Sequence, residues 1–476
     1  MNHYEVLAPE LVLLGLAFAL VTLELLFPQL RKDLVAYLTA ASAIGVLVAS
    51  AFFANRSDSF KDLIQLDNYT TFFRILFLGT AALLAIASAH LVRDKLSNAG
   101  EYYGLLLLGV IGATYMAAAS ELLTAYIALE LLNFTLYVLV SFDRKDPRSG
   151  EAGLKYILLS AFASALLLFG ISFIFGVTGT TSYAGIRHAL EAGIGEYRGT
   201  LVVGLVLLLT GLGFKVAAVP FHMWTPDAYE GAPLPVTAYI SIVAKAAGFA
   251  LFLRLFSQAF MPVISDWRWM VALLAALTMV FGNLIALQQV NIKRLLAYSS
   301  ISQVGYMLIA IAALSHDSAT ALLLHLGGYA ITNLAAFIAI IAFYNATGGE
   351  EIRDFRGLAE RHAGLAMTLT IALFSLAGMP LFAGFMTKFI LFQAAAQHGL
   401  LWLSAFGVVT SMISLYYYLM VIRQMYVLKP RDGDGRLRVP LLTSAVLVVL
   451  ALGIFFVGIW PTPLFRAAAS ATRLLF

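Results

Sequence analysis

Cysteine is absent from this 476-residue chain. The absence excludes disulfides, thiolate metal sites, iron–sulfur clusters and a cysteine nucleophile within the chain, so any associated redox chemistry must belong to another chain. Charged residues are also scarce, at 12% of the sequence, against about 25% in soluble domains. The net charge of +4 is small, and the basic residues are spread over short loops. Nucleic-acid binding therefore has no support.

Hydrophobic residues make up 61% of the chain, whereas soluble proteins contain about 45–50%. A membrane-spanning helix needs about 20 mostly apolar residues. The pattern predicts an all-α polytopic membrane protein with about 14 spans. They lie at about 8–27, 34–54, 70–92, 102–119, 121–141, 152–177, 200–219, 234–257, 267–290, 294–314, 318–344, 364–395, 400–427 and 440–460.

The first apolar run, Leu11 to Phe27, follows Glu5 and Glu10 rather than lysines. We therefore expect a retained first span and not a cleaved signal peptide. Alternate loops, beginning with the first, carry most of the basic residues, and such loops face the cytoplasm. Both termini are then expected on the outer side of a bacterial cytoplasmic (inner) membrane. The basic loop residues are Arg31, Lys32, Arg93, Lys95, Arg144, Lys145, Arg148, Lys293, Arg294, Arg353, Arg356, Arg361, Lys429, Arg431, Arg436 and Arg438.

Two apolar spans are interrupted by glycine and proline and carry one lysine each. The seventh contains GLGFKVAAVP and the twelfth contains SLAGMPLFAGFMTKF. Interruptions at matching places in two halves are typical of transporters built from inverted repeats. We expect one transmembrane domain over 1–476, with helices 1–3 at 8–92, five-helix repeats at about 102–257 and 267–428, a last helix at 440–460, and discontinuous helices 7 and 12.

Glu130 lies in the middle of the fifth span, and Lys215 and Lys245 lie in the seventh and eighth. Ionisable residues at this depth are costly and by default mark an ion or proton path. Burial of a lysine favours its neutral form, and a nearby carboxylate favours the charged form. Glu130 and the two lysines are therefore candidates for proton transfer. The alternative for Glu130 is a bond to a neighbouring helix that fixes packing, and the alternative for the two lysines is a static ion pair.

Lys388, eight residues after Pro380, is the corresponding candidate in the second half, unless it only extends to an interface. His222 and His325 are candidate relays, because imidazole both accepts and donates protons near neutral pH. The alternative for His222 is a place at a helix break, where it satisfies backbone groups. Lys155 opens the sixth span and is either solvated or a supporting relay residue.

Four other charged residues have more peripheral expected roles. Glu24 and Arg254 are expected to anchor helices at an interface, and Asp227 and Glu230 to line a loop after the broken helix, where they could gather protons. The histidines lack metal-ligand spacing, so no metal is predicted. Nucleotide-binding and HExxH motifs are likewise absent from the sequence.

Four stretches together resemble the antiporter-like subunits of proton-pumping NADH:quinone oxidoreductase, respiratory complex I. They are PFHMWTPDAYEGAPLPVTAYISIVAKAA, RLLAYSSISQVGYM, ALELLNFTLYVLVSF and SLAGMPLFAGFMTKF. The resemblance covers nearly the whole chain, and the first stretch is highly specific. Two positions depart from the family pattern: Leu381 follows Pro380 where a second proline is common, and Thr387 precedes Lys388 where glycine is common.

The resemblance implies a proton-translocating subunit that couples electron transfer from NADH to quinone, in other subunits, to pumping. Glu130, Lys215 and Lys245 match the family's glutamate–lysine core and Lys388 its second-half lysine, whereas Lys155 and His222 match weaker supporting positions. It also implies 14 helices, neighbouring subunits that include M and K, and binding of NADH, FMN, iron–sulfur clusters and quinone by other subunits.

The sequence leaves two alternative functions open. A subunit of a multisubunit Na+/H+ antiporter would share the same core, and activity driven by a sodium gradient without NADH would favour it. A structural spacer would use its buried charges to hold helices in register. Neutral substitutions that preserve pumping but impair assembly would favour the spacer.

Overall fold

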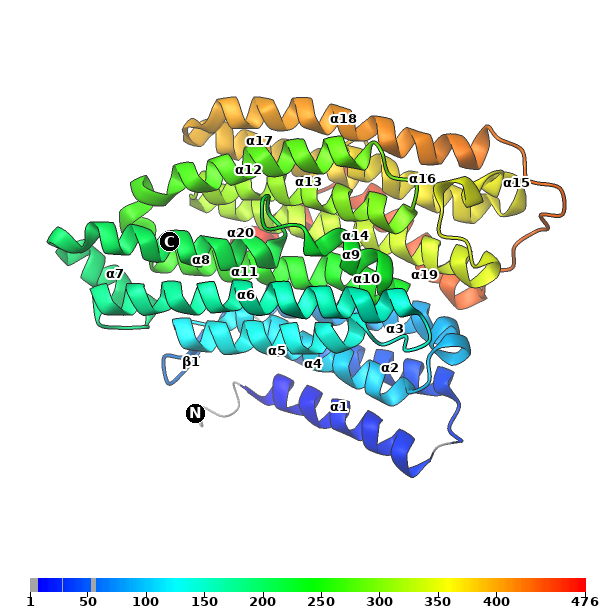
Figure 1. Cartoon of the computed structure of the whole chain (residues 1–476), viewed down its shortest axis with the longest axis horizontal. Helices are drawn as coiled ribbons and strands as arrows, with labels where there is room; N and C mark the ends of the chain where they lie inside the picture. The colour runs from blue at the N-terminus through cyan, green and yellow to red at the C-terminus, as the bar shows by residue number, and fades with distance from the viewer. Residues whose placement is uncertain (1–6, 28, 53–56) are drawn as a thin grey trace.

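Long apolar helices lie side by side and form one bundle (Figure 1). The computed structural model describes residues 7–27, 29–52 and 57–476. The first half contains α1 (Ala8–Leu26), α2 (Lys32–Ala51), α3 (Asn68–Lys95), α4 (Ala99–Ala118), α5 (Leu122–Val140), α6 (Pro147–Thr178), α7 (Tyr183–Ala192), α8 (Arg198–Val216), α9 (Trp224–Gly231), α10 (Leu234–Tyr239) and α11 (Lys245–Gln258). A short hairpin of β1 (Asp58–Phe60) and β2 (Ile64–Leu66) precedes α3.

The second half contains α12 (Ile264–Ala286), α13 (Ile292–Ala312), α14 (His316–Thr347), α15 (Leu358–Arg361), α16 (Ala363–Ala377), α17 (Ala383–Ala395), α18 (Leu401–Tyr426), α19 (Leu441–Ile459) and α20 (Thr462–Thr472). Single turns of 3-10 helix lie at Gly195–Tyr197, Met261–Val263 and Ile352–Phe355. A π-helical turn, Ile240–Ala244, joins α10 to α11.

The helices fit the 14 predicted spans. Thirteen described stretches are long and apolar enough to cross a membrane, and α16 is a shorter apolar helix. The 44-residue stretch Ala383–Tyr426 contains two helices, α17 and α18. They are separate because the chain bends at His398 and Gly399. When α16 and α17 are taken as the two halves of one span, α18 becomes the next, and the prediction of about 14 crossings is confirmed.

The seventh span is broken after α8. Ala217 adopts a left-handed conformation with φ of 66° and ends α8, and the chain turns before α9 begins at Trp224. The turn is fixed on two sides, because Trp224 Nε1 donates to the Phe214 carbonyl at 2.9 Å and the Val219 amide donates to Thr278 Oγ1 at 2.9 Å. The predicted loop that carries Asp227 and Glu230 is wrong, since both residues lie on helix α9.

The twelfth span is broken between α16 and α17. Gly378, with φ of 87°, ends α16, and Leu381 also has a positive φ, of 75°. Proline fixes φ near −65°, so the family's usual second proline could not adopt the backbone that Leu381 has here. The presence of leucine rather than proline at position 381 therefore goes with a break in which Leu381 has a positive φ.

Helices of the two halves make corresponding contacts. In the first half α4 packs on α5 and α6 packs on α8; in the second, α12 packs on α13 and α14 packs on α16 and α17. Glycine allows close approach at both first pairs: a Cβ on Gly112 would lie 2.8 Å from the Leu132 amide, and one on Gly282 would lie 2.6 Å from the Ser302 amide. Small residues at such crossings let membrane helices pack closely.

Polar side chains cap several helices and tie distant segments together. Glu121 accepts from the Thr124 amide at the start of α5 at 2.7 Å. Glu24, on α1, accepts from the amides of Ala99 and Gly100 at 2.9 and 2.6 Å, which satisfies the free N–H groups at the start of α4. The expected anchoring role of Glu24 therefore takes the form of a helix cap supplied by another helix.

Candidate functional site

Glu130 and Lys215 are joined through a neutral amide. The Glu130 carboxylate on α5 accepts from Ser164 Oγ at 2.5 Å and from Asn133 Nδ2 at 3.2 Å. Lys215, at the end of α8 and 3% exposed, donates from Nζ to Asn133 Oδ1 at 2.6 Å. Asn133 lies one helical turn after Glu130, so both side chains reach the same face of α5. Asn133 therefore stands between the carboxylate and the ammonium group.

Lys245 lies on α11, which packs against the end of α8 that carries Lys215. A Cβ on Gly248 would lie 3.3 Å from Lys215 Cγ, so the absent side chain lets α8 approach α11 at this point. Lys245 is 1% exposed and follows the π-helical turn directly. Its Nζ donates to Ser300 Oγ at 2.5 Å, and Ser300 Oγ contacts Tyr229 OH at 3.2 Å. The ammonium group thus bonds to one neutral hydroxyl group, which in turn bonds to a second.

Lys388 occupies the second broken helix. It is 4% exposed, and its Nζ donates to the Leu376 carbonyl at 2.8 Å and to Ser411 Oγ at 3.1 Å. The ammonium also lies 4.7 Å from the centre of the Tyr306 ring. The Leu376 carbonyl is one of those freed by the end of α16, so the break supplies a partner for the lysine. A pocket of about 240 Å³ with mainly apolar walls opens next to Lys388.

The two histidines have different surroundings. His325 on α14 is buried, and its Nδ1 lies 2.9 Å from Oγ1 of Thr387, the residue before Lys388. The family's usual glycine at position 387 could not make this contact. His222 lies in the turn between α8 and α9. In the part of the chain that the structure describes, His222 Nδ1 and His325 Nε2 are buried atoms without a hydrogen-bond partner.

The buried cations divide into two groups. Arg74, Arg254, Lys293 and Arg361 each form an ion pair, with Glu10, Asp67, Glu350 and Asp434 respectively. Lys215, Lys245 and Lys388 form no ion pair with any carboxylate among residues 7–27, 29–52 and 57–476. Their hydrogen-bond acceptors are an amide, hydroxyl groups and a carbonyl.

The paired cations hold helices together. Arg254 on α11 donates from Nη2 to Asp67 at 2.7 and 2.9 Å, and Asp67 also caps α3 by accepting from the Thr70 amide. Arg254 thus anchors a helix, as the sequence predicts. Arg74 on α3 contacts Glu10 on α1 at 2.7 Å. Sequence reasoning does not identify Asp67 or Glu10 as partners, because each pair joins residues far apart in the chain.

Lys155 lies at the edge of the bundle rather than among the buried lysines. Its Nζ contacts Glu151 at 2.8 Å and Asp227 at 3.1 Å. Asp227 and Glu230 on α9 also contact Arg294, at 3.2 and 2.7 Å. A pocket of about 240 Å³ lies among these side chains. These charged side chains form one cluster beside α9, the helix that follows the first break.

Sequence reasoning identifies the charged members of the site but misses their neutral partners. The structure connects Glu130 to Lys215 through Asn133, and it brings His325 against Thr387, the residue before Lys388. Asn133, Ser164, Tyr229 and Ser300 complete the contacts. Only the position of Asn133 one turn from Glu130 could have indicated such a role. In the described segments, no group of three or more His, Asp or Glu residues could hold a metal ion.

The fold and site define a class of protein: a polytopic membrane subunit of the antiporter type, with two broken helices and buried lysines. Residues 119–414 match the family described as NADH:quinone oxidoreductase/Mrp antiporter, transmembrane. The chain belongs to this family and, within it, to the group named subunit N of NADH-quinone oxidoreductase. Its opening, APELVLLGLAFALVTLELLFP, and Lys388, where subunit M typically has glutamate, are the features of the sequence that favour this group.

Curated relatives match over the full length. The chain is 40% identical to NADH-quinone oxidoreductase subunit N of Moorella thermoacetica, with all of both chains covered. It is 41% identical to the subunit N of Trichlorobacter lovleyi, over 99% of this chain and 98% of the relative.

Solved structures agree. A chain of respiratory complex I from Thermus thermophilus is 31% identical, with a TM-score of 0.81 over 97% of this chain and 99% of that chain. A chain of the Mrp complex from Dietzia sp. DQ12-45-1b has a TM-score of 0.86 over 100% and 98% of the two chains, at 22% identity, and this likeness shows the fold alone.

Proposed function

We propose that this chain moves protons across the membrane as a module of NADH-quinone oxidoreductase, through Glu130, Lys215, Lys245 and Lys388. One observation carries the proposal: the three lysines are buried without a carboxylate partner, whereas the other buried cations are paired, within the described residues. A buried, unpaired ammonium group is costly. Such a lysine releases its proton more readily than a cation that is held by a carboxylate.

The Asn133 bridge controls the first transfer. With Asn133 between them, Glu130 and Lys215 make no direct hydrogen bond or ion pair, and each bonds to the Asn133 amide. A small movement of α5 or of the Asn133 side chain would let the carboxylate contact Nζ and stabilise the charged lysine. Return of the bridge would weaken that stabilisation, and Lys215 would release its proton toward Lys245.

Transfer continues through Lys245 and the hydroxyl groups around it. Lys245 contacts Ser300, and Ser300 contacts Tyr229, and hydroxyl groups can both accept and donate. The π-helical turn before Lys245 supports a local role for this segment, because π-turns within helices are frequent at functional sites.

The second half receives the proton at Lys388, and His325 serves as a relay next to it. His325 contacts Thr387, and its ring centre lies 6.4 Å from that of Tyr329. The hydroxyl of Tyr329, Gln303 Oε1 and His325 Nε2 are buried polar atoms without a partner among the described residues, so they are free to bond to water or to a transferred proton. At the first broken helix, His222 Nδ1 is likewise buried without a hydrogen-bond partner among the described residues.

Protons enter through the charged cluster of Lys155, Asp227, Glu230 and Arg294. The basic loops at this end of the bundle support a cytoplasmic position, with both termini on the outer side of a bacterial inner membrane. The repeats that carry the two broken helices extend over about 102–257 and 267–428.

Electron transfer takes place in other subunits. NADH, FMN, iron–sulfur clusters and quinone are bound there, and this chain performs no redox chemistry of its own. Its neighbours include subunits M and K. Rearrangement caused by quinone reduction reaches this chain through those contacts and shifts the Glu130–Asn133–Lys215 contacts.

The test is NADH-driven proton pumping in inverted membrane vesicles, with NADH oxidation and assembly of the complex measured in parallel. Glu130→Ala and Lys215→Ala are expected to assemble and to lower pumping and coupled turnover. Normal pumping by an assembled Glu130→Ala/Lys215→Ala double variant would contradict the mechanism. Sodium-driven proton movement without NADH would favour an antiporter subunit. Impaired assembly, with normal pumping by the complexes that do assemble, would favour a structural spacer.

A further inference from the structure

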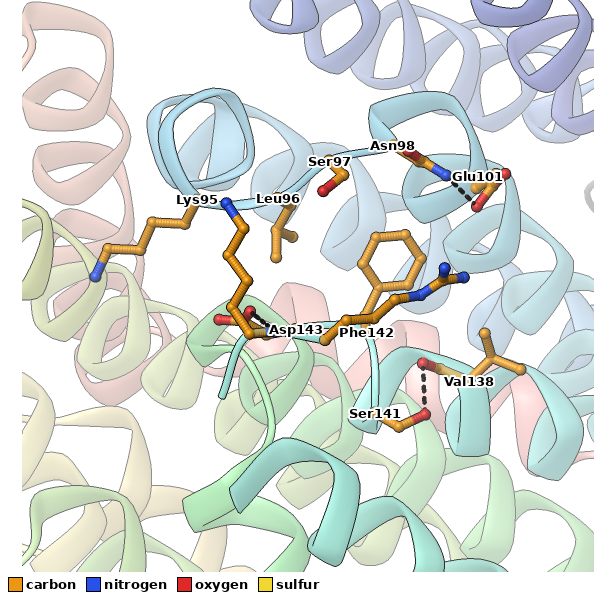
Figure 2. A pocket seen from close by; sticks show the side chains of 11 residues that line it. Lys95, Leu96, Ser97, Asn98, Glu101, Val138, Ser141, Phe142 and Asp143 are labelled. Atoms are coloured by element: carbon orange, nitrogen blue, oxygen red, sulfur yellow. Dashed lines mark hydrogen bonds between the residues drawn. The ribbon is translucent and has the colours of Figure 1, made fainter. Parts of the chain in front are cut away.

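A small polar pocket lies between the connection from α3 to α4 and the connection from α5 to α6. Figure 2 shows residues Lys95 to Asn98 on one side and Ser141 to Asp143 on the other. Its volume is about 160 Å³, and Arg144, Lys145, Glu101 and Val138 complete the lining. The pocket lies outside the proton-transfer site and at the end of the bundle where basic loops gather. Residues at this depth face the phospholipid headgroups.

Two of the nearby cations already have partners. Lys32 Nζ donates to the Leu96 carbonyl at 2.6 Å. Lys95 Nζ lies 3.8 Å from the centre of the Tyr344 ring, and its side chain is directed away from the pocket in Figure 2. These two lysines raise the local positive charge without occupying the pocket.

Arg144 and Lys145 have exposed side chains without an ion-pair partner in residues 7–27, 29–52 and 57–476. The two carboxylates of the lining make other contacts: Asp143 Oδ1 accepts from the Lys145 amide at 3.1 Å, and Glu101 Oε2 accepts from Asn98 Nδ2 at 2.8 Å. The guanidinium and ammonium groups are therefore available to an anion. Phosphate suits both, because arginine can bind it through two hydrogen bonds.

An apolar stripe on α5 leads away from the pocket. Val138 lines the pocket and is 49% exposed, and Phe134 and Ile127 are 59% and 67% exposed. Spacings of four and seven residues put these side chains on one face of the helix. The stripe runs from the loop end of α5 toward the middle of the bilayer. A headgroup in the pocket would therefore place its acyl chains against α5.

We propose that this pocket binds the phosphate group of an anionic phospholipid, with Arg144 and Lys145 contacting the phosphate and the α5 stripe contacting an acyl chain. Basic residues just outside a membrane helix attract anionic lipids. The apolar stripe favours a lipid over free phosphate, because phosphate alone would leave the stripe without a role.

The test measures binding of phosphatidylglycerol to the purified, delipidated full chain by native mass spectrometry. Phosphatidylcholine and glycerol phosphate serve as the comparison ligands. Arg144→Gln/Lys145→Gln is expected to weaken phosphatidylglycerol binding about tenfold, because two charges that attract the phosphate are removed. The matched control is Arg436→Gln/Arg438→Gln, which removes the same charge from another exposed loop. The control is expected to bind like the unmodified chain.

Equal phosphatidylglycerol affinity of the two double variants would overturn the proposal. Equal affinity of the unmodified chain for phosphatidylcholine, or equal competition by glycerol phosphate, would also overturn it, the latter in favour of a free-phosphate site. Val138→Trp narrows the lining without changing charge and is expected to weaken phosphatidylglycerol binding. If the Arg144→Gln/Lys145→Gln variant does not fold, Val138→Trp tests the proposal instead. Unchanged phosphatidylglycerol affinity of Val138→Trp would then overturn the proposal that the pocket binds an anionic phospholipid.

Discussion

At the scale of single residues, the partner of a buried charge indicates its role. A cation that faces a carboxylate, such as Arg254 with Asp67, is held in place and stabilises the contact between two helices. A lysine that faces only an amide or a hydroxyl keeps its charge at a cost and can lose its proton. We propose that this distinction separates anchoring residues from residues that transfer protons, without reference to any relative.

Asn133 offers the sharpest test of the transfer mechanism. Asn133→Asp puts a carboxylate where Oδ1 now lies 2.6 Å from Lys215 Nζ. The resulting ion pair should hold the proton on Lys215, so we expect pumping per NADH oxidised to fall by about tenfold or more, which corresponds to about 1.4 kcal/mol of added stabilisation. Proton pumping and NADH oxidation in inverted vesicles provide the measurement.

Asn133→Leu is the companion variant, because it removes the bridge without adding charge. We expect it to assemble and to slow pumping as well. Unaltered pumping by both variants would show that the bridge has no part in transfer.

Substitutions at the paired cations or their partners are expected to lower the stability of the chain. Asp67→Ala leaves the buried Arg254 guanidinium without its carboxylate and removes the cap of α3. Removing one partner of a buried ion pair costs about 3–5 kcal/mol, so we expect a clear loss of thermal stability in detergent. Lys215→Met, which removes an unpaired charge, should leave the unfolding temperature unchanged or raise it. Equal destabilisation by both would contradict the division of the buried cations.

The sequence predicts the charged members of the site because each interrupts an otherwise apolar run. It could not predict Asn133 as a bridge, since asparagine in a membrane helix has many possible partners and the choice depends on where α8 ends. Asp67 was missed for a similar reason: its partner Arg254 lies 187 residues away.

At the scale of elements, the two broken helices support the site in different ways. The end of α8 presents Lys215 just before the break, whereas α17 presents Lys388 after it. The second break depends on close backbone contact, since a Cβ on Gly384 would lie 1.7 Å from the Ser375 carbonyl oxygen. Ser375 Oγ also accepts from the Gly384 amide at 3.0 Å.

We therefore expect Gly384→Ala to destabilise the chain by at least about 1–3 kcal/mol, the usual cost of overpacking. The measurement is thermal unfolding of the purified chain in detergent. Gly176→Ala on α6 is the matched control, because a Cβ there meets nothing within 4 Å. It should be neutral or stabilise the helix by up to about 1 kcal/mol. A Gly384→Ala variant as stable as the control would contradict this account of the break.

The spans themselves were predictable, because an apolar run of sufficient length has few other structures open to it in a bilayer. Sequence reasoning gave no prediction for the β1–β2 hairpin, α7 or α20. These elements are short, and contacts with the rest of the bundle hold them, as when Asn68 Nδ2 donates to Ser470 Oγ at 2.9 Å between α3 and α20.

At the scale of the whole molecule, the loops on the two ends of the bundle differ in charge. The connection between α18 and α19 lies at one end in Figure 1, and α7 and the short turn before α8 lie at the other. The excess of lysine and arginine at the first end predicts that this end faces the cytoplasm. The absence of native cysteine makes the chain suitable for labelling at single introduced thiols.

Glu196→Cys and Asp432→Cys test this orientation, since both positions are exposed. In intact spheroplasts, a membrane-impermeant maleimide should label Glu196→Cys and leave Asp432→Cys unlabelled. Both should react after the membrane is opened. The reverse pattern in intact spheroplasts would invert the predicted topology and exchange the two sides of the proton path.

The cap that Glu24 provides has a consequence for biogenesis. Glu24 is synthesised about 75 residues before the amides of Ala99 and Gly100 that it binds. During synthesis, the Glu24 carboxylate therefore has no access to these amides until the segments that form α2 and α3 have been made. The contact between α1 and the start of α4 can therefore form only after the first residues of α4 have been synthesised, later than the contact between α1 and α2 becomes possible.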